Sequence, residues 1–538
     1  MADQIREEWF ATYPFVPLQD IVLKTVKKTE GKGKNKVVKE EKVERKLQFV
    51  KQLLFGDYIK AIVEDGAYVT ETFEGVEYVK VHCRNADGYL RWDQMQEERP
   101  VEINFIDVGQ GDGCHIVTSD DKHFLVDAGK ESNMYRFLKW RFNLRSPKNK
   151  APGFTVVITH SDADHYKGFK AIFEKAKPVD QPEGTPEEEK TPQIRIKKIY
   201  HNGMIEGSGN VAQALGTVVT HSGKTYITDL CDTDDDYKKR VEEIESGLIK
   251  KAEDEVIHAG DYIDLLKKTE APKKALRVET IGKPVYLYNN KKGTTMEIMG
   301  PVAEVIDGKP ALPYFGSAGK TKNGHSVIIK LTVGHLKLLL GGDLNMEAEN
   351  YLLKKYSGTD VAAIVKELKK KNLKPEERME KEAELQEAID KAREYLGVDI
   401  AKSCHHGSDE FTSEFLQALN PLATVISSGD DESYCHPRPD TLGTIGKYSR
   451  GHRPMIYSTE LARSGKEFLK LDKLDLSSQK KNERVVTVYG MINVRTDGNR
   501  VIFAQKLERK ATNGYTWDIH KLEWNEKKGE FELVGAKE

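Results

Sequence analysis

The sequence has no long hydrophobic run, no close cysteine pairs and no excess of either charge. No apolar stretch approaches the roughly 18 residues of a membrane helix, so we expect no membrane partner. The five cysteines are odd in number and none lies close to another in the sequence, which argues against a disulfide framework. Because 84 Lys and Arg face 86 Asp and Glu, the net charge of −2 excludes a cationic nucleic-acid coat over the whole molecule. The opening residues lack a basic start and an apolar run, which predicts a cytoplasmic location.

What the chain does have is length and enough apolar residues for a large core. Its 538 residues correspond to about three to four domain equivalents at about 150 residues each. Hydrophobic residues make up 38% and charged residues 32%. This balance predicts a globular protein with a strongly charged surface.

Residues 1–98 are predicted to form a small all-β domain, because short strand-like runs alternate there with charged turns. The runs LLFGDYIKAIVEDGAYV and GVEYVKVHCRNADGYLRWDQM resemble bacterial Src-homology-like barrels. We expect this domain to dock on a partner protein or on the rest of the chain. The charge-rich segment 29–46 predicts a solvated loop within it.

Residues 99–538 are predicted to form one larger α+β domain. Runs typical of buried strands alternate with segments whose apolar residues have helical spacing. The strand-like runs include VEINFIDVGQGDG, HFLVDAG and FTVVITHSDADH. Two insertions are expected, near 178–300 and 357–396. The first begins with a Pro- and Glu-rich surface segment, and the second is a charged helical hairpin broken at Pro375.

The strongest local signal is the run THSDADH, which directly follows the strand-like FTVVI. It places His160, Asp162, Asp164 and His165 within six residues at a predicted strand-to-helix turn. Imidazole and carboxylate are ordinary ligands of zinc and of harder ions such as manganese. His160 and Asp162 are placed to face one ion, and Asp164 and His165 a second. The alternative is a polar turn with an aspartate capping the helix.

Three further strand ends carry metal-capable side chains. Asp343 closes LKLLLGGD, where a carboxylate is placed to bridge two ions, although an ordinary turn would also use it. His405 and His406 follow IAKSC, and paired surface histidines also occur by chance. His436 precedes a proline that restricts its backbone, and it is a candidate ligand or a donor of a proton to a leaving group.

The ordered pieces FIDVGQGDG, LVDAG, HSDADH, GGDL, HHGS and SGxxxxxxHP, between residues 105 and 437, resemble the metallo-β-lactamase superfamily, most closely its ComEC-type branch from DNA-uptake proteins. The resemblance implies an αββα sandwich with metals at the strand ends. It also implies that Asp127 orients the ligand loop. The metal ligands that it implies are His160, Asp162, Asp164, His165, Asp343 and His405 or His406.

The sequence departs from the superfamily at two points. Asp162 stands where histidine is usual, which fits the ComEC-type branch and shifts the preference somewhat toward manganese. No histidine matches the isolated third motif, and His436 is a candidate for that vacancy. We therefore expect two divalent ions, zinc or manganese, while a single-ion site stays open.

The predicted chemistry is hydrolysis by a metal-bound hydroxide, because divalent ions lower the pKa of bound water and polarise phosphoryl or carbonyl oxygens. Asp164 and His436 are the candidate catalytic residues, and Lys402 and Arg438 the candidate substrate contacts. No GxSxG motif is present. A Cys404–His405 pair is disfavoured, because neighbours on a strand face opposite sides.

The resemblance points to phosphodiester hydrolysis, with single-stranded DNA as the leading substrate. One alternative is hydrolysis of a carbon ester, lactone or thioester, as elsewhere in the superfamily. Another is a non-enzymatic scaffold in which the N-terminal domain is the functional module. Lysine-rich stretches at 142–150 and near 273 could line a nucleic-acid track or simply be solvated surface.

Overall fold

The structure is a computed structural model of the chain, and it describes residues 5–30, 37–176, 191–252, 255–429, 435–451, 453–459, 490–507 and 514–535. The architecture is mixed α/β with several sheets. The Pro- and Glu-rich segment expected at the start of the first insertion lies mostly outside these residues. Among the described helices, none combines the length and the apolar character needed to cross a membrane.

The N-terminal part forms an antiparallel sheet of eight strands in the order β10-β1-β4-β8-β9-β2-β3, with β7 added to β8. We call it the N-terminal sheet. Its strands are β1 (Glu8–Ala11), β2 (Phe15–Glu30), β3 (Val37–Leu54), β4 (Tyr58–Ala61), β7 (Thr70–Phe73), β8 (Val76–Cys83), β9 (Ala86–Leu90) and β10 (Met95–Gln96). A short hairpin, β5 (Val63–Glu64) and β6 (Ala67–Tyr68), and the turn η2 (Trp92–Gln94) complete it. That this sheet closes into a barrel, as the resemblance implies, stays a prediction.

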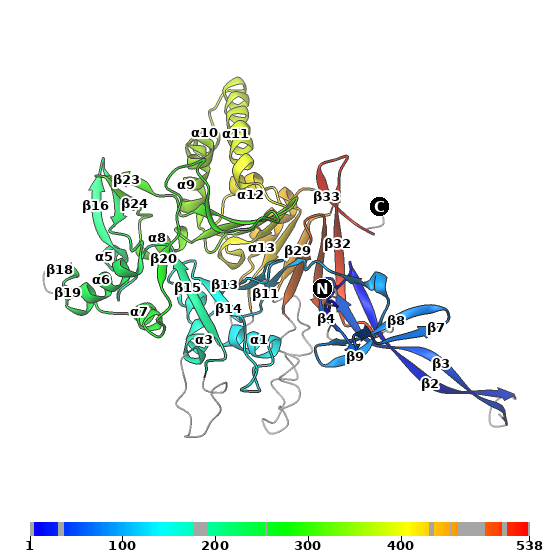
Figure 1. Cartoon of the computed structure of the whole chain (residues 1–538). Helices are drawn as coiled ribbons and strands as arrows, with labels where there is room; N and C mark the ends of the chain where they lie inside the picture. The colour runs from blue at the N-terminus through cyan, green and yellow to red at the C-terminus, as the bar shows by residue number, and fades with distance from the viewer. Residues whose placement is uncertain are drawn as a thin grey trace, which may run out of the picture.

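The solvated loop expected over residues 29–46 is wrong for most of its length. Strand β2 continues to Glu30, and β3 begins at Val37 and pairs with it over the whole hairpin. The second half of the segment, VVKEEKVERK, contains three valines, which favour strands, and its main chain pairs with β2. In Figure 1 this hairpin projects from the body of the molecule.

The first large sheet has ten strands, in the order β20-β15-β14-β13-β12-β11-β30-β31-β32-β33. They are β20 (Lys273–Ala275), β15 (Arg195–His201), β14 (Gly153–Val157), β13 (His123–Ala128), β12 (Gly113–Val117), β11 (Val101–Phe105), β30 (Ile492–Thr496), β31 (Arg500–Lys506), β32 (Trp517–Asn525) and β33 (Glu530–Leu533). Strands β20, β15, β14 and β13 are parallel, and the remaining pairs are antiparallel.

The second large sheet has seven strands, in the order β21-β22-β25-β26-β27-β28-β29. They are β21 (Val285–Asn289), β22 (Thr294–Gly300), β25 (Ile328–Val333), β26 (Leu336–Leu340), β27 (Ile400–Lys402), β28 (Ala423–Ile426) and β29 (Met455–Ser458). Strands β26 to β29 are parallel and the first four are antiparallel. Each large sheet therefore joins an antiparallel half to a parallel half.

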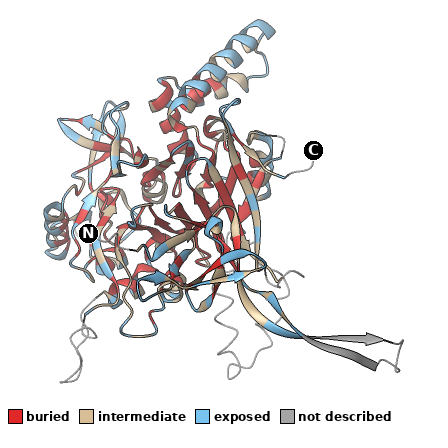
Figure 2. Cartoon of the chain, turned by 45° about the vertical axis from the view of Figure 1, so that its right-hand side comes forward, coloured by how far each residue is buried: buried red, intermediate tan, exposed pale blue. Residues whose placement is uncertain are grey.

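One hydrophobic cluster joins the two large sheets. It contains Phe124 and Val126 of β13 together with Leu338 of β26 and Val425 of β28. Leu125, between the first two, belongs to a second cluster on the other face of its sheet. Because successive strand residues point to opposite faces, β13 is buried on both sides. Figure 2 shows that buried residues concentrate in these sheets.

Helices contribute to both clusters. The second cluster includes apolar residues of α1 (Asn133–Arg141), α3 (Phe169–Lys175), α6 (Asp234–Glu245) and α7 (Asp261–Leu266). The first includes residues of α9 (Met346–Ser357), α11 (Pro375–Leu396) and α12 (Ser413–Leu419). The remaining helices are α2 (Ala163–Tyr166), α5 (Ala212–Leu215), α8 (Ala318–Gly324), α10 (Val361–Leu368), α13 (Pro439–Tyr448) and the turn η3 (Cys404–Gly407).

The expected helical hairpin is present as α10 and α11, and Pro375 is the first residue of α11. Proline suits that position, where its missing N–H is not needed. Both helices project from the body of the molecule (Figure 1). Within residues 178–300, β16 (Thr217–His221) and β17 (Lys224–Thr228) form a hairpin, which β24 (Lys309–Pro313) and β23 (Glu304–Ile306) extend to a four-stranded sheet. The same stretch carries a two-stranded sheet of β18 (Lys250–Ala252) and β19 (Glu255–Val256).

The N-terminal sheet contacts strands β30 and β31 of the first large sheet. Leu54 and Phe55 pack against Ile502 and Ala504 of β31 in a small apolar cluster. The buried guanidinium of Arg495 donates to Phe55 O at 2.7 Å. The N-terminal domain thus docks on the rest of the chain, which was one of the two expectations for it.

Candidate metal centre

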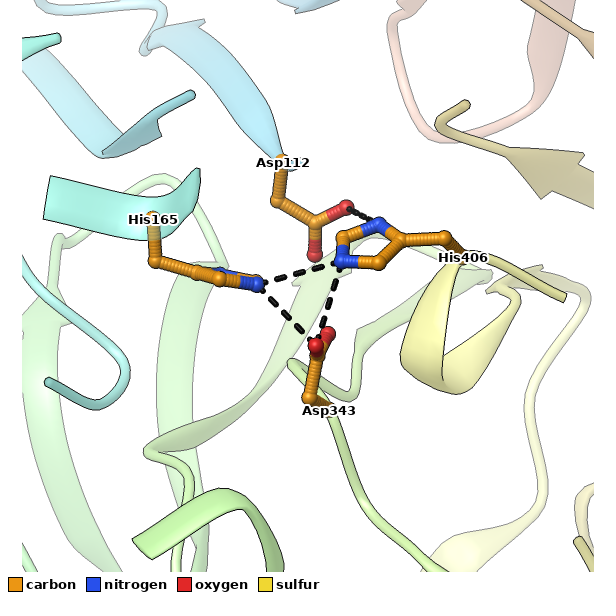
Figure 3. A group of neighbouring side chains, drawn as sticks. All are labelled: Asp112, His165, Asp343 and His406. Atoms are coloured by element: carbon orange, nitrogen blue, oxygen red, sulfur yellow. Dashed lines mark hydrogen bonds and ion pairs between the residues drawn. The ribbon is translucent and has the colours of Figure 1, made fainter. Parts of the chain in front are cut away.

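The candidate site lies where parallel strands of both large sheets end. The loop after β14 carries His160, helix α2 directly after it carries His165, Asp343 follows β26, and His406 follows β27. Strands that run in parallel present their carboxyl ends at one edge, so residues distant in sequence meet there. Four buried residues, Asp112, His165, Asp343 and His406, have ligand atoms that all lie within 4.8 Å of one another. Figure 3 shows their side chains converging.

Three of the four form a tight triangle. The Nε2 atoms of His165 and His406 are 3.2 Å apart, and each lies 3.1 Å from Asp343 Oδ2. Zinc–nitrogen bonds of 2.0–2.1 Å in a tetrahedron place neighbouring donors about 3.3–3.4 Å apart. The triangle therefore has nearly the dimensions of one face of a tetrahedral site.

The orientation of both imidazoles also suits a cation. His165 Nδ1 lies 2.8 Å from Asp127 Oδ2, and His406 Nδ1 lies 3.1 Å from both Ser427 O and Asp112 Oδ1. Oxygen partners at Nδ1 place the proton there, so each Nε2 offers a lone pair. Against burial, Asp343 raises the pKa of both His165 and His406, so a cation at the facing nitrogens, either a proton or a metal ion, is stabilised. The donor set thus fits a divalent metal ion.

Asp127 holds the ligand loop as well as His165. Its Oδ1 accepts from Thr159 N at 2.8 Å, and its Oδ2 accepts from Thr159 Oγ1 at 2.7 Å. Asp127 is itself 1% exposed, so these bonds form away from water. The predicted role of orienting the ligand loop agrees with this placement.

Asp112 is the member of the group that the sequence analysis did not name as a ligand. It lies in the loop between β11 and β12, within the run GQGDG, which served there only as a landmark of the resemblance. The signal was a carboxylate in a glycine-rich loop directly before a buried strand. Its Oδ2 forms an ion pair with Lys402, and its Oδ1 faces His406.

Close backbone approach explains the glycines of that loop. Gly111 has φ +97°, and a Cβ there would lie 1.7 Å from Asp164 O. Only a residue without a side chain permits both this backbone conformation and this contact. The loops that carry Asp112 and Asp164 consequently touch through their main chains.

The predicted ligands His160, Asp162 and Asp164 border the group of four without belonging to it. His160 is buried, and its Nε2 makes no hydrogen bond among the described residues, although Asp162 Oδ2 lies 3.6 Å away. Asp162 Oδ1 pairs with Lys322 at 2.6 Å, so one of its oxygens is already engaged. Asp164 Oδ2 lies 3.6 Å from His406 Nε2.

The predicted ligand His405 and the candidate His436 lie near His406 but do not belong to the group of four. The ring centroids of His405 and His436 are 5.9 Å apart, and those of His406 and His436 are 6.5 Å apart. Burial, together with His406 and His405, lowers the pKa of His436 to about 4, so its imidazole is neutral near pH 7. A neutral imidazole can act as a ligand or accept a proton.

The two predicted substrate contacts differ in exposure. Lys402 is 3% exposed, donates to Gly342 O at 3.0 Å and lies 3.8 Å from Asp343 Oδ1. This placement favours an internal counter-ion over a contact with substrate. Arg438 is half-buried at the start of α13, and its backbone N donates to Gly407 O at 2.8 Å, next to His406.

The buried carboxylates of the site are ionised. Burial alone would raise the pKa of Asp343, but His165 and His406 outweigh it and hold that pKa well below its usual range. Against burial, Lys402 and His406 lower the pKa of Asp112 to about 2. The site therefore holds two ionised carboxylates beside Lys402 and the two imidazoles, and a divalent cation at the imidazole nitrogens would take over part of their charge compensation.

Comparison with known proteins gives neither a matching protein-family model nor a curated protein with significant sequence similarity. The arrangement of the site residues is therefore the basis for a functional proposal.

Proposed function

We propose that this protein is a metal-dependent hydrolase that cleaves phosphodiesters, with single-stranded DNA as the leading substrate. The observation that carries the proposal is the buried triangle of His165, Asp343 and His406, whose donor atoms lie 3.1–3.2 Å apart. The preference for phosphodiesters over other esters comes from the ComEC-type order of motifs in the sequence.

The proposed fold is the αββα sandwich of the metallo-β-lactamase superfamily. Two features support it. A single apolar cluster joins the two large sheets, and helices contribute to that cluster and to the one on the other face of the first large sheet. The candidate ligands follow parallel strands of both sheets, as the superfamily resemblance implies.

In this proposal His165, Asp343 and His406 hold one ion, and Asp112 lies beside them with its oxygens on Lys402 and on His406 Nδ1. His160 and Asp162 lie next to the triangle, together with Asp164, and are available for a second ion. When bound, zinc or manganese lowers the pKa of a water ligand and polarises a phosphoryl oxygen. Carboxylate-rich surroundings are compatible with both metals.

The protein side chains have distinct proposed tasks. Asp127 fixes the tautomer and the direction of His165, and Asp112 does the same for His406. Asp164, the most exposed carboxylate near His406, takes up the proton of the attacking water. Arg438 is placed at the site's edge to meet the negative charge of a phosphodiester.

The test combines metal analysis with hydrolysis of bis(p-nitrophenyl) phosphate and single-stranded DNA. Purified protein is loaded with zinc or manganese, dialysed, and measured for bound metal and for turnover. We expect near-stoichiometric metal and turnover of a phosphodiester, with both lost in His165→Ala and Asp343→Asn. His221→Ala is the matched control, because His221 is exposed on β16. Protein without bound metal and without turnover would instead support the scaffold alternative.

The carbon-ester alternative is separated in the same assay. A lactone and a thioester are offered beside the phosphodiesters at equal metal loading. Turnover of the carbon esters alone would overturn the phosphodiesterase proposal while leaving the metal centre intact.

A further inference from the structure

A second charged cavity lies away from the candidate metal centre, between the N-terminal sheet and the first large sheet. Its volume is about 250 Å³. Strand β3 and the turn after β8 form one wall, and α1, β11, β30 and β31 form the other. None of the four clustered metal-ligand candidates lines it. Figure 1 shows the N-terminal strands beside the C-terminal strands of the large sheet.

The lining of this cavity is strongly cationic. The lining contains two acidic and five basic side chains, and the basic residues are Lys51, Arg84, Arg141, Arg495 and Lys506. Both acids already have partners. Glu102 binds Arg141 through two hydrogen bonds of 2.8 and 2.7 Å, and Asp57 lies 2.9 Å from Arg495 Nη1.

Lys51 and Arg84 have no acidic partner within ion-pair distance among the described residues. The guanidinium of Arg84 stacks over the ring of Trp140, 4.8 Å from its centroid, and the residue stays solvent-accessible although it lines a cavity. Burial and the nearby charge of Arg84 lower the pKa of Lys51, while Asp57 acts in the opposite direction. Asp57, which is already paired with Arg495, offsets part of the positive charge of Lys51 and Arg84, and the basic residues around the cavity still outnumber the acidic ones.

We propose that this cavity binds a phosphate-bearing anion, whose phosphate is held between Lys51 and Arg84. A phosphate dianion matches the surplus positive charge, and guanidinium groups bind phosphate oxygens in pairs. The cavity has more room than a single phosphate needs, and Phe49, Trp140 and Trp517 also line it. Aromatic rings of this kind stack on nucleobases, so the phosphate group of a nucleotide is one source and free phosphate the other.

The walls of the cavity are tied together before any ligand arrives. Gln52 Oε1 on the N-terminal sheet accepts from Thr516 N and Trp517 N, at 3.1 and 3.2 Å. Arg495 donates to Phe55 O from the opposite wall. A preformed pocket loses less conformational freedom when it binds, which favours a specific site over a diffuse charged surface.

The experiment measures binding of inorganic phosphate, adenosine 5′-monophosphate and adenosine by isothermal titration calorimetry. It uses the full chain carrying Asp343→Asn, so that anion binding at the candidate metal centre does not contribute. In this background Arg84→Gln and Lys51→Gln are compared with Lys80→Gln. Lys80 lies on β8 near Arg84 but does not line the cavity. Thermal unfolding checks that each variant is folded.

We expect phosphate and the nucleotide to bind, and Arg84→Gln and Lys51→Gln to weaken binding at least about tenfold, while Lys80→Gln changes it less than about twofold. Tighter binding of the nucleotide than of phosphate identifies a nucleotide ligand, and equal binding identifies free phosphate. Absence of binding at millimolar concentration overturns the proposal. So does equal weakening by Lys80→Gln, which would indicate a general charge effect. None of these outcomes depends on whether the protein is a hydrolase.

Discussion

His165 and His406, 241 residues apart in the sequence, face each other with their Nε2 atoms 3.2 Å apart. Each ring has an oxygen acceptor at its other nitrogen, and Asp343 Oδ2 lies 3.1 Å from both facing Nε2 atoms. The facing atoms therefore form a position that favours a cation. The orientation of the His165 ring can therefore be tested by a substitution that leaves His165 itself in place.

Asp127→Asn tests that orientation. The variant keeps all four clustered residues but replaces the acceptor at His165 Nδ1 with an amide that can flip and donate. We expect metal affinity to fall by about 10- to 100-fold, the range typical for residues that orient metal-binding histidines. Competition with a chromophoric chelator measures the change.

Asp121→Asn provides the matched control for this experiment. Asp121 Oδ1 lies 3.1 Å from His123 Nε2, an aspartate–histidine pair on the same strand region but outside the site. Its substitution should leave metal affinity unchanged. Equal effects of the two variants would show that Asp127 acts on general stability and not on His165.

Glu102→Gln tests the buried charges beside the second cavity. Glu102 pairs with Arg141 and lies 3.5 Å from Arg495, and all three side chains are nearly buried. Removal of one charge from such a network leaves buried cations unpaired, which costs about 3–5 kcal/mol. Urea unfolding should show that loss. Glu71→Gln breaks the exposed pair with Arg45 and should cost no more than about 1 kcal/mol.

We expect the ionisation of Glu349 to make the stability of the protein depend on pH. Burial outweighs its bonds to Thr412 and raises its pKa from 4.5 to about 8. The native carboxyl is therefore protonated at neutral pH, whereas the unfolded one is ionised. Its contribution to stability is present below about pH 4.5 and is lost as pH rises toward about 8, with an upper bound of about 5 kcal/mol.

The measurement compares free energies of unfolding at pH 5.5, 7 and 9. The wild type should lose stability over this range more steeply than Glu349→Gln, which cannot ionise. Exposed Glu376→Gln should follow the wild type. Parallel curves for the wild type and Glu349→Gln would show that Glu349 is ionised in the native protein.

The sequence shows some of these features and hides others for physical reasons. His165, Asp343 and His406 each follow a buried apolar run, and a strand end is visible in a local pattern. The residues that orient these ligands cannot be recognised in this way. Asp112, for example, acquires its role only through Lys402 and His406, which lie almost three hundred residues further along the chain. Likewise, the lysine-rich hairpin of β2 and β3 resembles a loop by composition, and its strands are defined by pairing with each other.

The second cavity was equally inaccessible to sequence reasoning. Lys51, Arg84 and Lys506 belong to separate segments, and each alone is an ordinary surface cation. Only the docking of the N-terminal sheet on β30 and β31 brings them to one space. Charge clusters of this kind depend on tertiary contacts and leave no trace in spacing.

Gly111→Ala tests whether contact between the two ligand loops supports the site. A Cβ at Gly111 would lie 1.7 Å from Asp164 O, so the main chain must move. Gly66 has a similar positive φ of +76° but no atom within 4 Å of the added Cβ. Gly66→Ala should therefore lower the free energy of unfolding only through its backbone conformation, by about 1 kcal/mol. Gly111→Ala should lower it by at least about 3 kcal/mol. Bound metal should fall in Gly111→Ala alone, and equal metal content in the two variants would show that this loop contact does not support the site.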